Sequence, residues 1–126
     1  AAGIATLKIV SQPDFFNSLE NITSELIVGL RRAASKFNIK NFSADHVGGM
    51  FGLYFRNEVP KTFDDVLESD IELFKRFFHE MLTRGVYLAP SPYEAGFLSI
   101  EHRGEPIQKI LKAAEDSFGV INAQST

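Results

Sequence analysis

One carboxylate stands inside an otherwise apolar, turn-rich stretch at residues 85–97 of this 126-residue chain. Glu94 follows Pro92 and Tyr93 and lies three residues before Phe97. A charge buried without a partner is too costly to keep, so this carboxylate must reach solvent, a cationic group or the amine of a ligand. The residues alone leave two interpretations open: a glutamate in a surface turn, or a glutamate in the wall of a binding site.

The three histidines lack the spacing of a metal site. His79 and the glutamate after it form half of a zinc-protease helix motif, which needs a second imidazole four residues later to meet the same metal. Thr83 occupies that position. His46 and His102 belong to other predicted elements, so we interpret all three histidines as packing or surface residues and expect no metal site.

Neither the glycines nor the serines form a catalytic motif. Gly48, Gly49 and Gly52 are followed by no Lys-Ser or Lys-Thr pair and by no predicted helix start, so the pattern favours a turn over a phosphate loop. Ser91 and Ser99 lack the residues of a nucleophile elbow. We therefore expect no serine nucleophile.

Composition excludes several classes of function. The formal net charge is -3, and the 13 basic residues are dispersed among 16 acidic ones, which gives no basic footprint for nucleic acid. The absence of cysteine excludes a disulfide framework and suits a reducing cytosol. No apolar run approaches the length of a membrane span. The hydrophobic fraction of 44% is sufficient for one core.

Two helices are predicted in the first third of the chain. Residues 1–10 are apolar around nearly the whole helical circumference, which indicates a helix with neighbours on every side. Pro13 suits the first turn of a second helix, whose apolar residues recur at steps of three and four as far as Phe37. A chain that opens without methionine on such an all-round apolar helix is what we expect of a piece of a larger protein.

Two further helices follow later in the chain. Residues 69–72 fit a capping box, with Ser69 as the N-cap of a helix that ends at Gly85. Pro106 lies in the first turn of the last helix, which we expect Gly119 to end.

The remaining apolar segments are predicted strands. Residues 39–47 and 50–55 form two strands joined by a glycine pair, and residues 86–88 and 97–100 are two shorter candidates. The predicted fold class is α+β, with the three later helices packed on one face of a small, mainly antiparallel sheet.

Three blocks of residues carry a family resemblance: 47–53 (VGGMFGL), 77–82 (FFHEML) and 85–97 (GVYLAPSPYEAGF). Together with the opening residues and with residues 99–102, they make the chain resemble the C-terminal part of glutamate-1-semialdehyde 2,1-aminomutases. These are class III aminotransferase-like, fold-type I enzymes that depend on pyridoxal phosphate. The resemblance implies that residues 1–12 are the end of a large-domain helix, that residues 13–121 form the small domain, and that residues 122–126 form a frayed tail.

The resemblance also implies a function for the full-length parent. Enzymes of this family convert glutamate-1-semialdehyde, a small amino-aldehyde, to 5-aminolevulinate for tetrapyrrole (porphyrin) biosynthesis. Their cofactor is pyridoxal phosphate or pyridoxamine phosphate. The family's Schiff-base lysine lies upstream of Ala1, so the resemblance implies no catalytic or cofactor-binding residue here, no bound cofactor and no activity of this fragment alone. It gives Glu94 a substrate-binding role at the active-site mouth. It further implies a homodimer in the cytoplasm or a plastid.

The chain departs from the family pattern at three places. Glu101 precedes His102 where the family usually has alanine, Pro92 follows Ser91, and residues 56–63 diverge from the usual loop. Two other functions stay open: another class III aminotransferase as the parent, and a stand-alone, non-catalytic interaction domain.

Overall fold

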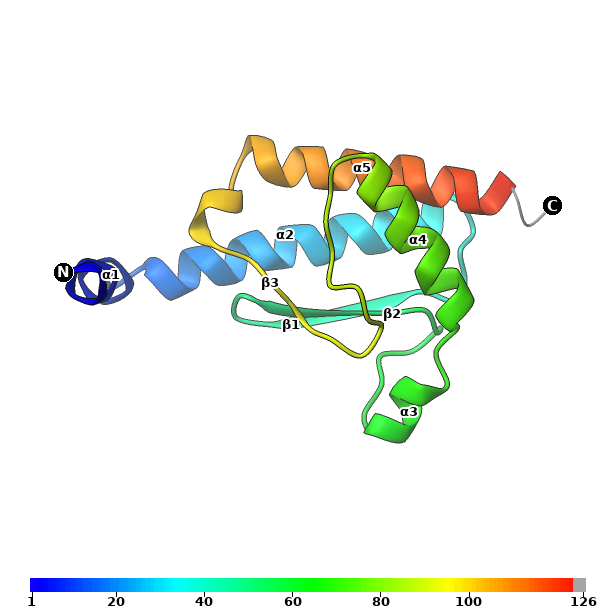
Figure 1. The fold of residues 1–126 in the computed structure, drawn as a ribbon, viewed down its shortest axis with the longest axis horizontal. Helices are drawn as coiled ribbons and strands as arrows, with labels where there is room; N and C mark the ends of the chain where they lie inside the picture. Colours follow the sequence, from blue (N-terminus) through cyan, green and yellow to red (C-terminus); the bar gives the residue numbers. More distant parts are fainter. Residues whose placement is uncertain (124–126) are drawn as a thin grey trace.

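Three long helices cover one face of a small antiparallel sheet (Figure 1). The computed structural model describes residues 1–123. The elements along the chain are α1 (Ala2–Val10), α2 (Phe15–Lys36), β1 (Ser43–Val47), β2 (Met50–Tyr54), α3 (Phe63–Leu67), α4 (Ile71–Thr83), β3 (Gly96–Phe97), the 3-10 helix η1 (Ile100–His102) and α5 (Glu105–Ala123). The predicted α+β class with a small antiparallel sheet is confirmed.

Helix α2 buries a stripe against both the sheet and α5. Its buried residues recur at helical spacing: Ile22, Thr23, Leu26, Ile27, Leu30, Ala33 and Ala34. The stripe weakens toward the start of the helix, where Phe15 and Leu19 are half-buried and Phe16 is 64% exposed. Thr23 is a buried polar residue that apolar periodicity does not identify. Its Oγ1 hydroxyl donates to the carbonyl oxygen of Leu19 at 2.9 Å, which satisfies the hydroxyl inside the helix.

Strands β1 and β2 form the predicted hairpin across the glycine pair. Val47 lies opposite Met50, and Gly48 has a φ of +56°, a left-handed conformation that glycine adopts without strain. Side chains alternate between the two faces of each strand. Ala44 and Phe51 are therefore buried under the helices, whereas Val47 and Met50 face the opposite side of the sheet.

Strand β3 completes the sheet with only two residues. Phe97 lies opposite Met50, and Gly96 lies opposite Phe51. The predicted strand over 97–100 is thus shorter than expected, because Ile100 already begins η1.

The predicted strand at residues 86–88 is wrong. The backbone N–H of Val86 donates to the carbonyl of Met81 and that of Gly85 to the carbonyl of Leu82, both at 3.0 Å. Gly85 has a φ of +80°. These bonds close the C-terminus of α4, so Val86 contributes its N–H to the helix end and not to a strand ladder.

Two predicted helix boundaries are also wrong. Asp70 is the N-cap of α4 and accepts from the Leu73 N–H at 2.9 Å, whereas Ser69 is buried and its hydroxyl has no hydrogen-bond partner within residues 1–123. Helix α5 continues through Gly119, where the missing side chain makes room for the ring of Phe37. The predicted tail starts at residue 122, yet residues 122 and 123 end α5, and 124–126 lie outside the described residues.

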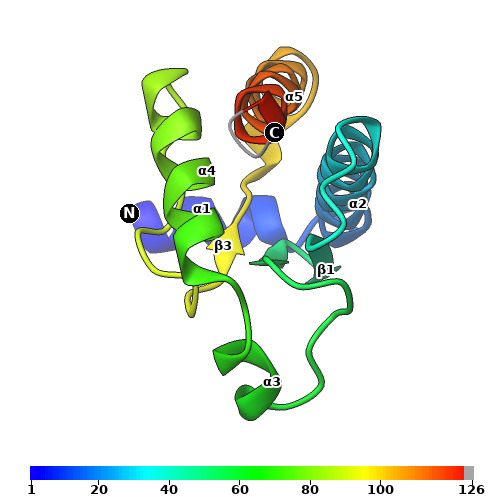
Figure 2. The ribbon, with the colours of Figure 1, turned by 90° about the vertical axis from the view of Figure 1, so that its right-hand side faces the viewer.

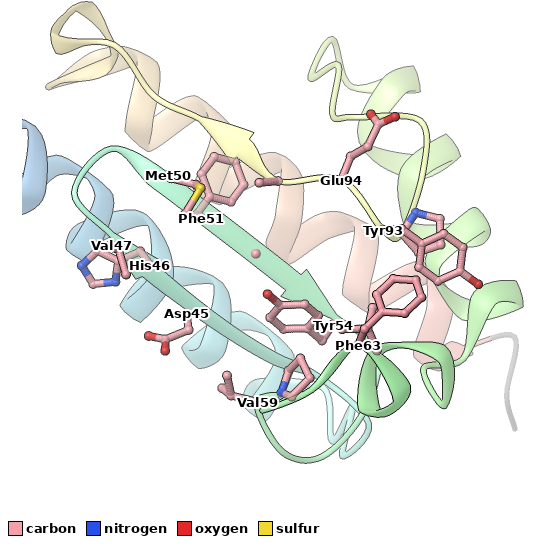
Figure 3. A pocket seen from close by; sticks show the side chains of 15 residues that line it. Asp45, His46, Val47, Met50, Phe51, Tyr54, Val59, Phe63, Tyr93 and Glu94 are labelled. Carbon is pink, nitrogen blue, oxygen red and sulfur yellow. The ribbon is translucent and has the colours of Figure 1, made fainter.

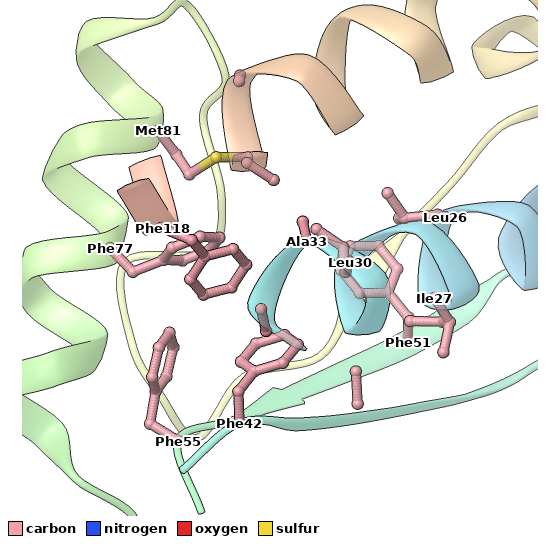
Figure 4. Packing of buried hydrophobic residues seen from close by; sticks show 14 of the residues in the cluster. Leu26, Ile27, Leu30, Ala33, Phe42, Phe51, Phe55, Phe77, Met81 and Phe118 are labelled. Carbon is pink, nitrogen blue, oxygen red and sulfur yellow. The ribbon is translucent and has the colours of Figure 1, made fainter. Parts of the chain in front are cut away.

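Four phenylalanine rings from separate segments of the chain meet at the centre of the core (Figure 4). Phe77 of α4 stacks on Phe118 of α5 with ring centroids 4.6 Å apart. Phe42, just before β1, lies 5.1 Å from the Phe118 ring and 5.4 Å from the Phe55 ring. Aromatic pairs contribute about 0.5–1.5 kcal/mol each beyond the burial of their area. These contacts hold the helices in place over the sheet.

Helix α1 forms as predicted but stands apart from the core at one end of the molecule (Figures 1 and 2). None of its residues is buried, and Ile4 and Leu7 are both 63% exposed. The neighbours predicted for this apolar helix therefore do not come from residues 1–123.

Candidate functional site

A groove of about 300 Å³ lies on the side of the sheet opposite the long helices (Figure 3). Its floor is formed by the outward residues of β1 and β2, including Met50, Gly52 and Tyr54. One wall comes from residues 59–66, which include most of α3. The other wall comes from residues 92–95, the segment that contains Glu94. Figures 1 and 2 both place α3 on this side of the sheet.

The α3 wall is an ordered element that sequence periodicity did not predict. The N–H of Asp70 donates to the carbonyl of Phe55 at 2.9 Å, which closes the segment between β2 and α4. Within it, Thr62 caps α3 by accepting from the Asp65 N–H at 3.2 Å. The Asp65 carboxylate accepts from the backbone N–H groups of Lys61 and Thr62, and these bonds hold its pKa below the ordinary value of 3.8. The sequence signal for this cap is a threonine followed by an aspartate three residues later.

The turn that carries Glu94 is fixed by local hydrogen bonds and by one ring contact. The Tyr93 N–H donates to Ser91 Oγ at 3.2 Å, and the Glu94 N–H donates to the Ser91 carbonyl at 3.3 Å. The Tyr93 ring lies 6.3 Å from the ring of Phe63, so the two walls of the groove touch. Ser91 therefore has a turn-forming role here.

Glu94 lies at the edge shared by this groove and a second hollow of about 230 Å³, which is lined mainly by residues 87–97. The glutamate is exposed, and its carboxylate has no ion pair or hydrogen bond within the described residues. In the view of Figure 3 the side chain extends from the rim, away from the rings of Tyr54 and Phe63. A carboxylate in a fixed turn and without a partner is available to an incoming cation or amine.

The charges that line the groove are acidic. Asp45 lies 4.0 Å from Arg31, so this carboxylate already has a cation beside it, and His46 Nε2 lies 3.3 Å from a carboxylate oxygen of Glu20. Neither hollow has a lysine or arginine in its lining. A group that enters either hollow therefore meets carboxylates and no side-chain cation of the lining.

The other sequence candidates lie apart from this groove or serve the fold. His79 is exposed on α4, and within residues 1–123 no three His, Asp or Glu side chains converge in a way that would hold a metal ion. Ser99 and His102 form a contact that the sequence analysis missed, with Ser99 Oγ 3.0 Å from His102 Nδ1. The same nitrogen lies 3.0 Å from the Ser99 N–H, which donates to it, so the pair caps η1. The sequence signal for this contact is a serine followed by a histidine three residues later.

No family model matches the chain. Two curated proteins from different bacteria are nevertheless similar to it in sequence. The chain is 49% identical over 123 residues to a glutamate-1-semialdehyde 2,1-aminomutase of Bordetella avium (strain 197N), covering 98% of this chain and 29% of that protein. It is 52% identical over 118 residues to the enzyme of that name from Polynucleobacter asymbioticus, covering 94% of this chain and 27% of the relative.

Solved structures share the fold. The pyridoxal-phosphate internal aldimine form of the FumI protein of Sphingopyxis sp. MTA144 superposes with a TM-score of 0.78 at 21% identity, covering 98% of this chain and 27% of that one. A glutamate-1-semialdehyde aminomutase from Pseudomonas aeruginosa PAO1 gives a TM-score of 0.76 at 18% identity, covering 91% of this chain and 25% of that one. At these identities the likeness concerns the fold alone. None of the helices described here combines the length and apolarity of a membrane span.

The chain thus spans less than a third of the length of the curated relatives it matches. In sequence and in fold it is similar to the C-terminal part of glutamate-1-semialdehyde 2,1-aminomutases, as its motifs predicted.

Proposed function

We propose that this chain is the C-terminal part of an enzyme that converts glutamate-1-semialdehyde to 5-aminolevulinate, a step of tetrapyrrole biosynthesis. The identity of 49–52% to proteins named for this activity supports the proposal. In such a parent, pyridoxal phosphate or pyridoxamine phosphate would supply the chemistry at the carbon–nitrogen bonds. We further propose that the parent is a cytoplasmic homodimer, in which residues 1–12 end a large-domain helix and residues 13–121 form the small domain.

The observation that carries the proposal is the Glu94 carboxylate, which lies between two hollows in a turn with ordered backbone bonds and has no partner within the described residues. A charge held in this way orients a substrate amine or a cationic group from the rest of the parent. Because the groove has no lysine in its lining, we propose that the chain alone neither forms an imine with the cofactor nor turns over the substrate.

The test uses a chimera in which this chain replaces the matching segment of the Bordetella avium relative. Turnover of glutamate-1-semialdehyde is measured for the chimera and for its Glu94→Gln variant, which keeps the shape of the side chain and removes the charge. A hydrogen bond to a charged group is worth about 1.5–3 kcal/mol, so turnover should fall roughly 10-fold to 150-fold with unchanged thermal stability.

Glu58→Gln is the matched control, because Glu58 is also exposed but belongs to the segment before α3 and does not line the groove. It should leave turnover unchanged. Equal kinetics of Glu94→Gln and the unmodified chimera would make Glu94 a surface turn residue. A large loss of thermal stability in Glu94→Gln would make its role structural.

A second candidate is a parent aminotransferase, which is favoured by the fold shared with a transaminase that binds pyridoxal phosphate, at a TM-score of 0.77. The chimera takes its large domain from an aminomutase, so the full-length parent distinguishes the two candidates. Net transfer of the amino group to an added 2-oxo acid by that protein would support the aminotransferase, whereas its formation of 5-aminolevulinate without an acceptor would support the aminomutase.

A further inference from the structure

The turn that carries Glu94 is shaped by hydrogen bonds that stay inside the turn. The Tyr93 N–H donates to the Oγ of Ser91, and the Glu94 N–H donates to the carbonyl oxygen of the same serine. Such bonds fix the backbone shape of a turn, but they do not set the direction in which the turn points from the rest of the molecule. A contact outside the turn must therefore help to decide where the Glu94 carboxylate lies.

The contact between the rings of Tyr93 and Phe63 is such an attachment (Figure 3). Among the hydrogen bonds, ion pairs and ring contacts within residues 1–123, it is the one that joins residues 89–95 to another part of the chain. On the C-terminal side, pairing with β2 begins only at Gly96. Tyr93 directly precedes Glu94, so a fixed Tyr93 ring restrains the peptide that leads into the glutamate.

Phe63 is held by an ordered support. It is the first residue of α3, and Thr62 before it forms a capping box with Asp65. The ends of the surrounding segment are joined by an ion pair, in which a guanidinium nitrogen of Arg56 lies 3.4 Å from a carboxylate oxygen of Glu68. The ring that Tyr93 meets thus belongs to a helix that is capped at its start and braced across its ends.

Burial separates this contact from the packing of the core. Phe63 is 64% exposed and Tyr93 is 45% exposed, and neither belongs to the buried cluster. A ring pair at this distance still contributes an attraction of its own beyond the burial of its area. Residues 56–63 are also where the chain departs from the family pattern, so the resemblance by itself did not predict the contact.

We propose that Phe63 is a positioning residue for Glu94: its ring holds the Tyr93 ring and thereby keeps the Glu94 carboxylate at the edge shared by the two hollows. Phe63 needs no contact with the substrate in this role. The inference rests on the proposed function of Glu94 and adds a residue, distant in sequence, on which that function depends. Loss of the ring pair should reduce Glu94-dependent turnover about 2-fold to 12-fold, the range that one aromatic pair corresponds to.

The first test uses the chain alone and requires no activity. The heteronuclear NOE of the Glu94 amide reports its motion on the picosecond to nanosecond timescale. Phe63→Leu removes the ring and should lower this NOE, whereas Phe63→Tyr keeps a ring and should preserve it. Phe16→Leu is the matched control, because Phe16 is also 64% exposed but its ring lies against Phe15 on α2.

An unchanged NOE at Glu94 in Phe63→Leu would overturn the proposal. An equal loss of the NOE in Phe16→Leu would also overturn it, because the effect would then not come from the ring contact with Tyr93.

The second test measures kcat and KM for glutamate-1-semialdehyde in the Bordetella chimera. Phe63→Leu should lower kcat/KM about 2-fold to 12-fold, and Phe63→Tyr should restore it. The same Phe63→Leu change in the Glu94→Gln chimera should have little further effect, because the carboxylate to be positioned is already absent.

The dependence on Glu94 distinguishes positioning from a structural role. If Phe63→Leu lowers kcat/KM by the same factor with and without the Glu94 carboxylate, Phe63 acts independently of Glu94 and the proposal is overturned. A lowered NOE at Glu94 in the Phe63→Leu chain, together with full turnover by the Glu94→Gln chimera, would support the attachment of the turn and contradict the proposed role of Glu94. The failure of one proposal is therefore distinguishable from the failure of the other.

Discussion

Replacing Gly96 with alanine tests how the short strand β3 is held against the core. A Cβ at this position would lie 2.1 Å from the Cζ atom of Phe51 and within 2.6 Å of two further ring atoms. Phe51 is only 8% exposed and is packed under the helices, so its ring has little room to move. Either the ring or β3 must shift.

Two opposing contributions determine the expected change in the free energy of unfolding. Overpacking of a core typically costs about 1–3 kcal/mol. Gly96 does not have a positive φ, so alanine fits its backbone and contributes about 0.4–1 kcal/mol of stability by restricting the unfolded chain. Subtraction of the two ranges leaves a net loss between about 0 and 2.6 kcal/mol. Its midpoint of about 1.3 kcal/mol corresponds to roughly 4–6 °C in melting temperature for a domain of this size.

The assay is thermal and urea unfolding of the chain, with Gly3→Ala as the matched control. Gly3 lies in α1 with no atom within 4 Å of its added Cβ, so the same change should be neutral or slightly stabilising. The double variant Gly96→Ala/Phe51→Leu should show favourable coupling, because the smaller side chain removes the clash. A Gly96→Ala variant as stable as the unmodified chain, with no coupling to Phe51, would refute the argument that β3 packs directly on this ring.

Three further outcomes are expected. Incubation of the chain with pyridoxal phosphate and borohydride should trap no adduct at one specific lysine, and a stoichiometric adduct at a single position would contradict the proposal that the parent's imine lysine lies elsewhere. The exposed apolar face of α1 should cause self-association, which Leu7→Lys should reduce in light scattering; a monomer at high concentration would count against this. The Asp65 cap should stabilise α3 fully above the ordinary carboxyl pKa of 3.8 and lose this effect as the pH falls through the lower folded-state pKa. An NMR titration of the Lys61 and Thr62 amides should therefore respond in this acid range, and an identical response in Asp65→Asn would exclude the cap as its cause.

The sequence by itself determined the features that depend on neighbours along the chain. Apolar periodicity predicted α1, α2, α4 and α5, because a helix repeats its faces every 3.6 residues whatever lies beside it. The glycine pair at 48–49 predicted the hairpin, because a two-residue connection needs residues that tolerate a left-handed backbone. The family resemblance was also readable from contiguous blocks of residues.

Tertiary structure decided the boundaries and the rest of the local structure. Helix α3 was missed because five residues are too few for a periodic signal. Asp70 is the N-cap of α4 and Ser69 is buried, although either residue type caps a helix in isolation. Gly119 does not end α5, because the surrounding helix is held by its packing and the glycine accommodates the ring of Phe37.

The surroundings of Glu94 also depended on the tertiary structure. The sequence identified a lone carboxylate in an apolar turn, but not that residues 59–66 would face it across the sheet. Alternation along a strand separates its side chains into two faces without saying which face the rest of the molecule covers. The helices cover the face of Ala44 and Phe51 and leave that of Val47 and Met50 exposed, because the connections of the chain carry all three long helices to the same side of the sheet.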